Sequence, residues 1–158
     1  MTDAPAGRQE QRLRARFRWA AGWLLLHAGA HLPAHWRLFL HADGPPEAQR
    51  GMVEALREIP VRGPLETSLW EVIGAFSLVY AVLLALLGAS GWILAREAPS
   101  AALRRHAWRH AWLLGAAALL LGLIHPLPQP LLAVGGGGLL FLWAALTRHD
   151  RSGHALHG

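Results

Sequence analysis

Three histidines stand four residues apart near the start of the chain, at His27, His31 and His35. On a helix that stays regular past Pro33, this spacing places the three imidazoles on one stripe. Two imidazoles four residues apart are well placed to bind a metal ion. The chain has ten histidines and no cysteine. The lack of thiols excludes disulfides, thiolate zinc sites, iron–sulfur clusters and haem attached through a CxxCH motif, so histidine is the main candidate ligand.

Two further residues are expected at the depth of these histidines. Glu71 stands close to the start of one long apolar segment, and His125 follows the end of another. If these segments cross a membrane in chain order, Glu71 and His125 reach the same layer as the histidines of the first segment. Three histidines and a carboxylate suit Zn²⁺, Cu²⁺ or Fe²⁺, and two histidines on facing helices could instead bind haem axially. The predicted metal site is therefore His31, His35, His125 and Glu71, with His27 as a further candidate.

These residues also have ordinary structural explanations. Glu71 completes a capping-box pattern that begins at Ser68, so its carboxylate could simply cap a helix. A buried His31 could be satisfied by a hydrogen bond to Ser77, to Tyr80 or to a backbone carbonyl. The ligand and structural interpretations both remain open at the level of sequence.

The elements that would position these groups follow from composition. Of the 158 residues, 53% are hydrophobic and 16% are charged, whereas an ordinary soluble domain has about 25% charged residues. The apolar residues gather into four segments near the length of about 20 residues that a membrane-spanning helix needs. The sequence predicts an all-α fold, an integral membrane four-helix bundle in which residues 1–158 form a single transmembrane domain. The expected spans are residues 19–40, 69–95, 103–124 and 131–147.

The distribution of arginine predicts the orientation. Eleven arginines and four acidic residues lie before Trp19, in residues 96–109 and in the tail from Arg148 onward. The other side of the predicted membrane has four arginines and six acidic residues. The positive-inside rule then places both termini in the cytoplasm, as four crossings require. The net charge of +5 therefore reflects membrane orientation, and we expect no nucleic-acid partner.

A cleaved signal peptide is the alternative for the first segment. Residues 8–30 contain an arginine-rich start, a short apolar run and the cleavage-like sequence Ala28-Gly29-Ala30. Cleavage would leave three crossings, with the basic loops on opposite sides of the membrane. The arginine distribution therefore favours an uncleaved first helix.

The arginines before the first span could contact an anionic surface. Arg8, Arg12 and Arg16 are spaced four residues apart, so they share one face of a helix. Such a stripe could bind nucleic acid or anionic lipid. Its position next to the predicted span favours lipid headgroups, so the expected partners are the bilayer and its anionic headgroups.

Residues 43–67 form the predicted outer segment between the first two spans. Residues 47–59 place Met52, Leu56 and Ile59 at helical spacing, which predicts a short amphipathic helix. Pro60 should end this helix, and Arg62-Gly63-Pro64 should turn the chain into the second span. The C-terminal residues 149–158 are expected to be a mobile tail.

Small residues predict where the helices pack, because membrane helices associate through close backbone approach. They recur every seven residues on the second and third spans, and four consecutive glycines lie within the fourth. The four glycines predict close packing or a kink, or alternatively an opening that admits a ligand. A proline-rich outer turn should precede the fourth span. The recurring small residues are Gly74, Ala81 and Gly88 on the second span and Gly115 and Gly122 on the third. The four glycines are residues 135–138, and the turn is residues 126–130.

Residues 68–78, followed by a leucine-rich run to Gly88, resemble an uncharacterised family of small four-pass bacterial inner-membrane proteins. The histidine-bearing first helix, the outer segment with Met52 and the proline-rich turn resemble that family as well. The resemblance implies a four-helix membrane fold and a bacterial inner membrane, and carries over no catalytic residue.

No nucleophile elbow, Walker loop or dinucleotide-binding motif occurs in the sequence. We therefore expect a non-enzymatic binding, partner or accessory subunit that could form homo- or hetero-oligomers. The alternative is a redox or transport protein that binds a transition metal or haem through the outer histidines.

Overall fold

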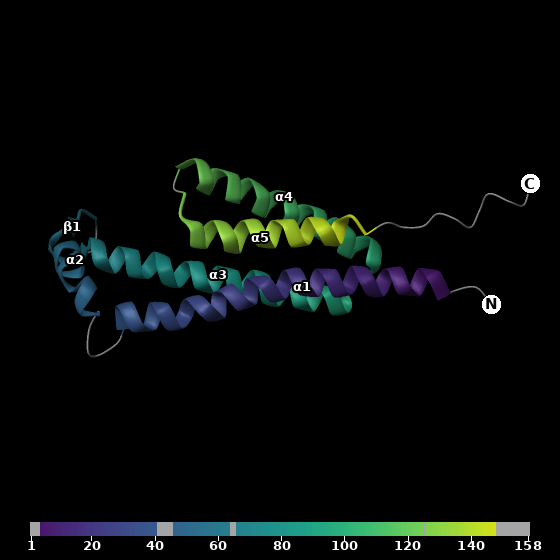
Figure 1. Cartoon of the computed structure of the whole chain (residues 1–158), viewed down its shortest axis with the longest axis horizontal. Coiled ribbons are helices and arrows are strands. Elements are labelled where there is room, and N and C mark those ends of the chain that lie inside the picture. Colours follow the sequence, from purple (N-terminus) through teal and green to yellow (C-terminus); the bar gives the residue numbers. More distant parts are fainter. Residues whose placement is uncertain (1–3, 41–45, 64–65, 125, 148–158) are drawn as a thin grey trace, which may run out of the picture. The chain divides into compact units, whose positions relative to one another are not determined.

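The computed structural model describes residues 4–40, 46–63, 66–124 and 126–147, and it confirms the predicted all-α class. Two short strands accompany the helices (Figure 1). The elements are α1 (Ala4–His35), the π-helix η1 (Trp36–Leu40), α2 (Glu47–Glu58), β1 (Pro60–Val61), β2 (Thr67–Ser68), α3 (Leu69–Glu97), α4 (Ser100–Ile124) and α5 (Pro128–Ala145).

Three of these helices, α3, α4 and α5, are long and apolar enough to cross a membrane. This supports the prediction of a membrane protein. Within the described residues α1 does not meet the same standard of hydropathy, because histidines interrupt its apolar part and arginines fill its first half. The fourth crossing, the orientation and the kind of membrane stay predictions.

The chain divides into two compact units. The central unit is Leu25–Leu86, and the terminal unit combines Met1–Leu24 with Leu87–Gly158. The long helices α1 and α3 are each divided between the two units, α1 after Leu24 and α3 after Leu86. The candidate site residues that the structure describes all belong to the central unit.

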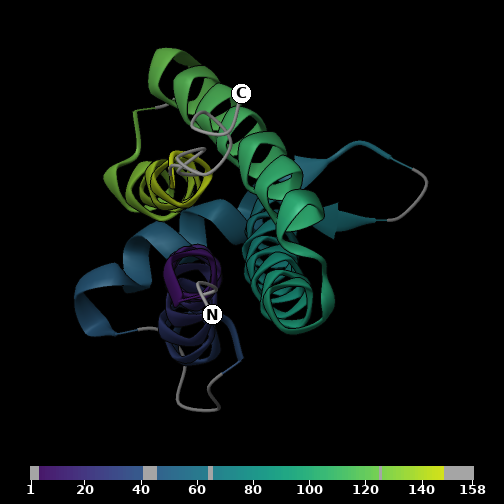
Figure 2. The ribbon, with the colours of Figure 1, turned by 90° about the vertical axis from the view of Figure 1, so that its right-hand side faces the viewer.

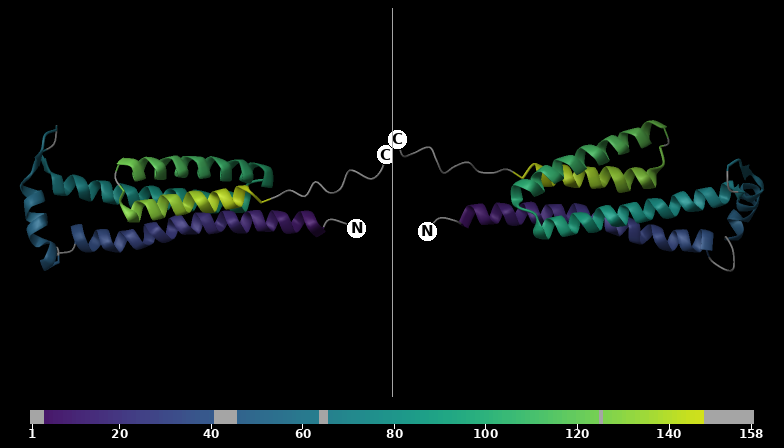
Figure 3. Two further views of the ribbon diagram at one scale, coloured as in Figure 1. Left: turned by 45° about the horizontal axis from the view of Figure 1, so that its top comes forward. Right: turned by 180° about the vertical axis from the view of Figure 1, so that it is seen from behind.

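Within the central unit, α2 lies across the ends of α1 and α3 (Figures 1 and 3). The predicted helix over residues 47–59 is confirmed, since α2 ends at Glu58, two residues before Pro60. Its buried residue is Val53, which is 1% exposed, whereas Met52 is 54% exposed. The β1–β2 pair after α2 is antiparallel, with Pro60 opposite Ser68. The sequence did not predict these strands, and Pro64 of the expected turn lies outside the described residues.

The terminal unit is built around the edge-to-face contact of Phe17 with Phe141, whose ring centroids are 4.9 Å apart. Helices α4 and α5 are antiparallel neighbours (Figure 1), and an end-on view shows them crossing at an angle (Figure 2). The four glycines lie inside a continuous α5. A β-carbon at Gly136 would lie 2.9 Å from the Trp23 ring, and one at Gly137 would lie 2.9 Å from Leu24 Cδ2. Close packing therefore explains these two glycines.

The other small residues give a divided result. Gly74, Ala81 and Gly88, the small residues predicted to pack on the second span, are all buried on α3, as the seven-residue repeat requires. Gly115 and Gly122 on α4 are exposed, yet a β-carbon at Gly138 of α5 would lie 3.2 Å from the Gly115 backbone nitrogen. The predicted close approach of helices is therefore found at Gly115. The buried residues of α4 are Leu103, Ala107 and Leu114.

Several element boundaries differ from the prediction. Helix α5 begins at Pro128 instead of residue 131, because proline lacks only an N–H that is unsatisfied in a first turn anyway. The expected turn over residues 126–130 is correspondingly shorter. Helix α1 begins at Ala4 instead of residue 19, so the arginine-rich segment continues the first span as a helix. The predicted tail, residues 149–158, lies outside the described residues.

Two of the N-terminal arginines contact protein groups in the terminal unit. Arg14 donates hydrogen bonds to the carbonyl oxygens of Ala95 and Ala98, at 2.9 and 3.0 Å, and pairs with Glu10. Arg16 lies over the Trp143 ring, with its guanidinium carbon 4.4 Å from the ring centroid. The predicted role of Arg8, Arg12 and Arg16 in binding lipid headgroups stays a prediction.

Candidate functional site

The candidate site lies in the central unit, where one face of α3 packs against the end of α1. Trp70, Gly74, Ser77 and Ala81 follow a three-and-four spacing that puts them on one face of α3. Helix α1 continues past Pro33 to His35. The condition under which His27, His31 and His35 share one stripe of the helix is thus met.

His31 and His35 converge on a single hydroxyl. His31 Nε2 lies 2.9 Å from Ser77 Oγ, and His35 Nδ1 lies 3.0 Å from the same atom. This confirms the structural interpretation in which Ser77 satisfies a buried histidine, and it extends it to two histidines. A hydroxyl has one proton to donate and can accept from others. When both imidazoles are neutral, at most one can accept from Ser77, so at least one donates to it.

This arrangement links the tautomers of the two imidazoles. If Ser77 donates to His35 Nδ1, then His31 Nε2 carries a proton and donates to Ser77. Reversal of the serine hydroxyl reverses both tautomers. The three side chains thus form a short hydrogen-bonded chain between α1 and α3.

Tyr80 lies next to this chain, one turn beyond Ser77. Its ring meets the His31 ring edge to face, with centroids 5.3 Å apart. Two buried polar atoms, His31 Nδ1 and Tyr80 Oη, have no hydrogen-bond partner among the described residues. Of the alternative partners considered for His31, Ser77 is therefore used and Tyr80 is not. Buried polar groups of this kind are rare, because an unmade hydrogen bond costs about 1–3 kcal/mol.

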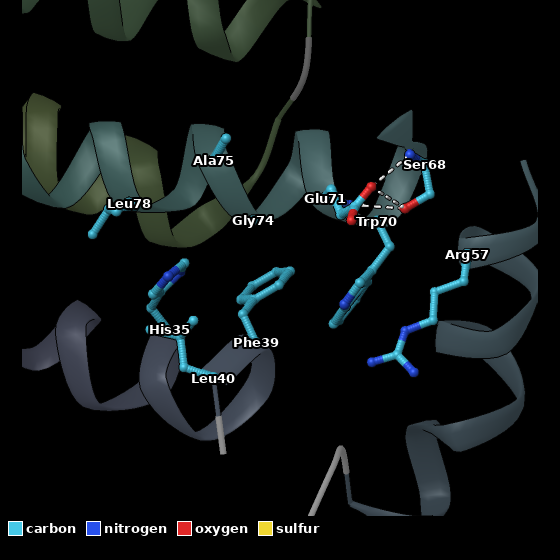
Figure 4. A pocket seen from close by; sticks show the side chains of 10 residues that line it. All are labelled: His35, Phe39, Leu40, Arg57, Ser68, Trp70, Glu71, Gly74, Ala75 and Leu78. Atoms are coloured by element: carbon cyan, nitrogen blue, oxygen red, sulfur yellow. Dashed lines mark hydrogen bonds between the residues drawn. The ribbon is translucent and has the colours of Figure 1, made fainter. Parts of the chain in front are cut away.

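An aromatic stack extends from His35 toward the start of α3. The His35 and Phe39 rings stack at 4.9 Å between centroids, and Phe39 stacks on Trp70 at 4.3 Å. Figure 4 shows the three rings in this order. Phe39 belongs to η1, and π-helical segments are frequent at functional sites. A β-carbon at Gly74 would lie 2.9 Å from Phe39 Cδ1, so glycine allows the ring to pack on the backbone of α3.

A cavity of about 670 Å³ lies beside this stack. His35, Phe39 and Trp70 line it from α1, η1 and α3, and Arg57 reaches it from α2 (Figure 4). His35 is only 6% exposed, whereas Arg57 is exposed. The cavity thus combines flat apolar rings with one cationic side chain, and Ser77 is not among its lining residues.

Glu71 also lines the cavity, but its carboxylate caps α3. Oε2 accepts hydrogen bonds from the Ser68 backbone N–H and the Thr67 hydroxyl, both at 2.8 Å. The Glu71 backbone N–H donates in turn to Ser68 Oγ at 3.3 Å. This is the reciprocal pattern of a capping box, so the predicted structural role of Glu71 is confirmed.

The predicted metal site is only partly described. His31 and His35 come together, and His27 lies one turn earlier on α1, but His125 is outside the described residues. Within the described ranges, no group of three or more His, Asp or Glu side chains is arranged to hold a metal ion. The four-residue metal site stays a prediction.

Sequence reasoning missed three residues of the site, Phe39, Trp70 and Arg57. Trp70 and Gly74 are one helical turn apart, which is the only local signal that a ring could pack there. Phe39 depends on η1, and no pattern in the sequence indicated a π-helix. Arg57 reaches the cavity because α2 folds back across the helix ends.

Comparisons with known proteins give no relative: no family model matches the chain, and no match was found among curated proteins or solved structures. The resemblance to small four-pass membrane proteins stays a prediction.

Proposed function

We propose that the chain is a four-span protein of the bacterial inner membrane with both termini in the cytoplasm. Three apolar helices and the arginine distribution support this arrangement. The fourth span is the second half of α1, in which His31 and His35 face α3 and not lipid. Placing His31 and His35 against Ser77 lowers the cost of carrying polar groups into the membrane.

We further propose that the protein is a non-enzymatic binding subunit whose ligand occupies the cavity beside His35. The observation that supports this most strongly is the stack of His35, Phe39 and Trp70 beside the Arg57 cation. Flat rings favour a planar apolar ligand, and a guanidinium favours a carboxylate or phosphate. The ligand class is thus a small planar amphiphile with an anionic group.

A catalytic role is not supported by the geometry. Ser77 and His31 form a serine–histidine pair, but neither lines the cavity. The Glu71 carboxylate, which does line it, is engaged by three donors of the helix cap. The remaining polar groups of the cavity can bind and orient a ligand.

Ligand retention tests this proposal. The protein and an Arg57→Gln variant would be purified from membranes in mild detergent, extracted with solvent and compared by mass spectrometry. Arg50→Gln is the matched control, because Arg50 lies two turns earlier on α2 and does not line the cavity. We expect an anionic planar molecule with the wild type and Arg50→Gln, and its loss with Arg57→Gln. Identical extracts from all three proteins would contradict the proposal.

A second candidate, haem or metal binding at His35, is favoured by one contact. Ser77 engages His35 Nδ1, which leaves Nε2 as the nitrogen that could bind iron or another metal. Metal-bound imidazoles commonly hydrogen-bond through their other nitrogen in this way. Haem would supply redox chemistry, and the rings of Phe39 and Trp70 could contact its face.

Absorption spectroscopy with metal analysis separates the two candidates. A Soret band that develops after addition of haemin would favour haem if it is lost in His35→Ala and kept in His106→Ala. Retention of Zn²⁺ or Cu²⁺ that depends on His35 would favour a metal. A colourless, metal-free preparation that gains nothing from haemin, Zn²⁺ or Cu²⁺ would exclude this second candidate.

A further inference from the structure

A second concave site lies in the terminal unit, on the surface between α4 and α5. It is an apolar groove of about 520 Å³. The lining side chains are almost entirely apolar and come from both helices. They include Trp108, Trp112, Gly115, Leu119, Gly138 and Leu142.

Glycines form the floor of this groove. A β-carbon at Gly115 would meet nothing within 4 Å, so the missing side chain leaves open space. Gly138 lies opposite, and a β-carbon there would lie 3.2 Å from the Gly115 backbone nitrogen. The helices thus approach closely at Gly138 and leave a hollow above Gly115, walled by Leu119 and Leu142.

One end of the groove has aromatic and cationic groups. Trp108 and Trp112 line that end, and Trp112 is 73% exposed. Arg104 and Arg105 precede Trp108 by four and three residues, so they lie one turn closer to the start of α4 on the same face. Tryptophan favours the membrane interface, and arginine there favours anionic headgroups.

We infer that this groove binds one anionic phospholipid. An acyl chain lies along Gly115 between α4 and α5, and the phosphate lies at Arg104 and Arg105. The charge pattern matches this occupant, because the cations lie at one end only and the rest of the groove is apolar. The inference uses the membrane placement of α4 and α5 from the proposed function and is independent of the cavity at His35.

Quenching by brominated lipid tests the inference. The purified protein would be titrated with brominated phosphatidylglycerol or brominated phosphatidylcholine, and tryptophan quenching followed. We expect a saturable component with an about thirty-fold preference for phosphatidylglycerol, because each arginine near an anionic lipid contributes on the order of fivefold in affinity.

Two variants and their controls locate the site. Gly115→Leu fills the hollow and should abolish the saturable component. Gly29→Leu is its control, because a β-carbon there also meets nothing within 4 Å. A double variant, Arg104→Gln with Arg105→Gln, should abolish the preference between the two lipids; Arg18→Gln, exposed on α1, should keep it.

Three outcomes would overturn the inference. Equal quenching of the wild-type protein by both lipids would show that Arg104 and Arg105 do not bind the anionic headgroup. Saturable quenching that survives Gly115→Leu would place the lipid elsewhere. A change of oligomeric state in Gly115→Leu without loss of lipid binding would assign the groove to a second copy of the chain. Each result leaves the ligand test at Arg57 unaffected, so failure here is distinguishable from failure of the proposed function.

Discussion

The ring of Phe39 packs on the backbone of α3 at Gly74, where a β-carbon would lie 2.9 Å from the ring. This contact places Phe39 between His35 and Trp70 and so aligns the wall of the cavity. A residue of η1 and a glycine of α3 therefore determine the shape of the candidate site. The histidines and the ring stack form one continuous contact between the two helices.

Gly74→Ala should disturb this contact. The added methyl group would force Phe39 to move, and overpacking of this kind costs about 1–3 kcal/mol of the free energy of unfolding. Near-ultraviolet circular dichroism should report the altered Phe39–Trp70 stack. Gly51→Ala on α2, where a β-carbon meets nothing within 4 Å, should leave stability unchanged or raise it by up to about 1 kcal/mol. Equal unfolding midpoints for the two variants would contradict the packing described.

Ser77→Ala removes the hydroxyl that both histidines share. We expect a loss of about 1–3 kcal/mol, because the imidazoles lose their common partner in a buried environment. The measurement is reversible unfolding in mixed detergent micelles. Ser90→Ala is the control on the same helix, since the Ser90 hydroxyl bonds only the Leu87 carbonyl and is exposed. A Ser77→Ala protein as stable as Ser90→Ala would show that the hydrogen-bonded chain contributes little.

Tyr80→Phe removes a buried hydroxyl that has no partner among the described residues. Because no protein hydrogen bond is lost, we expect the free energy of unfolding to stay the same or to rise by about 1 kcal/mol. The same unfolding assay measures this. A clear loss of stability would contradict this expectation and show that Tyr80 Oη has a hydrogen-bond partner in the folded protein.

Much of this arrangement could be predicted from sequence because it depends on local patterns. Hydropathy predicted α3 and α4, and the helical spacing of apolar residues predicted α2. The capping-box pattern indicated that Glu71 caps a helix. Ser77 was among the expected partners of His31, since a polar residue on the facing helix is the simplest way to satisfy an imidazole in an apolar segment.

The remainder depends on tertiary packing that no local pattern encodes. Nothing around Trp36 indicated a π-helix, so the position of Phe39 was not predictable. Gly115 and Gly122 have the spacing of a packing seam, and the Gly115 backbone does lie close to Gly138 of α5. Both glycines are nevertheless exposed, whereas Leu114 and Ala107 of the same helix are buried. A repeat of small residues predicts that backbones can approach, but the larger neighbours decide which face does so.

Arg14 should stabilise the C-terminal end of α3 in the terminal unit. Its guanidinium donates to carbonyl oxygens there, which have no partner further along the helix. Arg14→Gln should lower the free energy of unfolding by about 1 kcal/mol. Arg12→Gln, at an exposed position on the same helix, should change it by less than about 0.5 kcal/mol. Equal changes in the free energy of unfolding for the two variants would show that the hydrogen bonds of Arg14 do not stabilise this helix end.

The central claim is a four-span membrane protein with its binding cavity on the outer face, and single-cysteine labelling tests it most directly. The chain has no cysteine, so each introduced thiol is unique. Exposed positions in α1, α2 and α4 are Gly7, Ala55 and Ala101. Cells with a permeabilised outer membrane would be treated with an impermeant maleimide before or after lysis.

We predict that Ala55→Cys, two residues from Arg57, reacts in intact cells, whereas Gly7→Cys and Ala101→Cys react only after lysis. Labelling of Gly7→Cys together with Ala55→Cys before lysis would show that α1 does not cross the membrane. Protection of Ala55→Cys before lysis would place the cavity on the inner face. Either result would contradict the account.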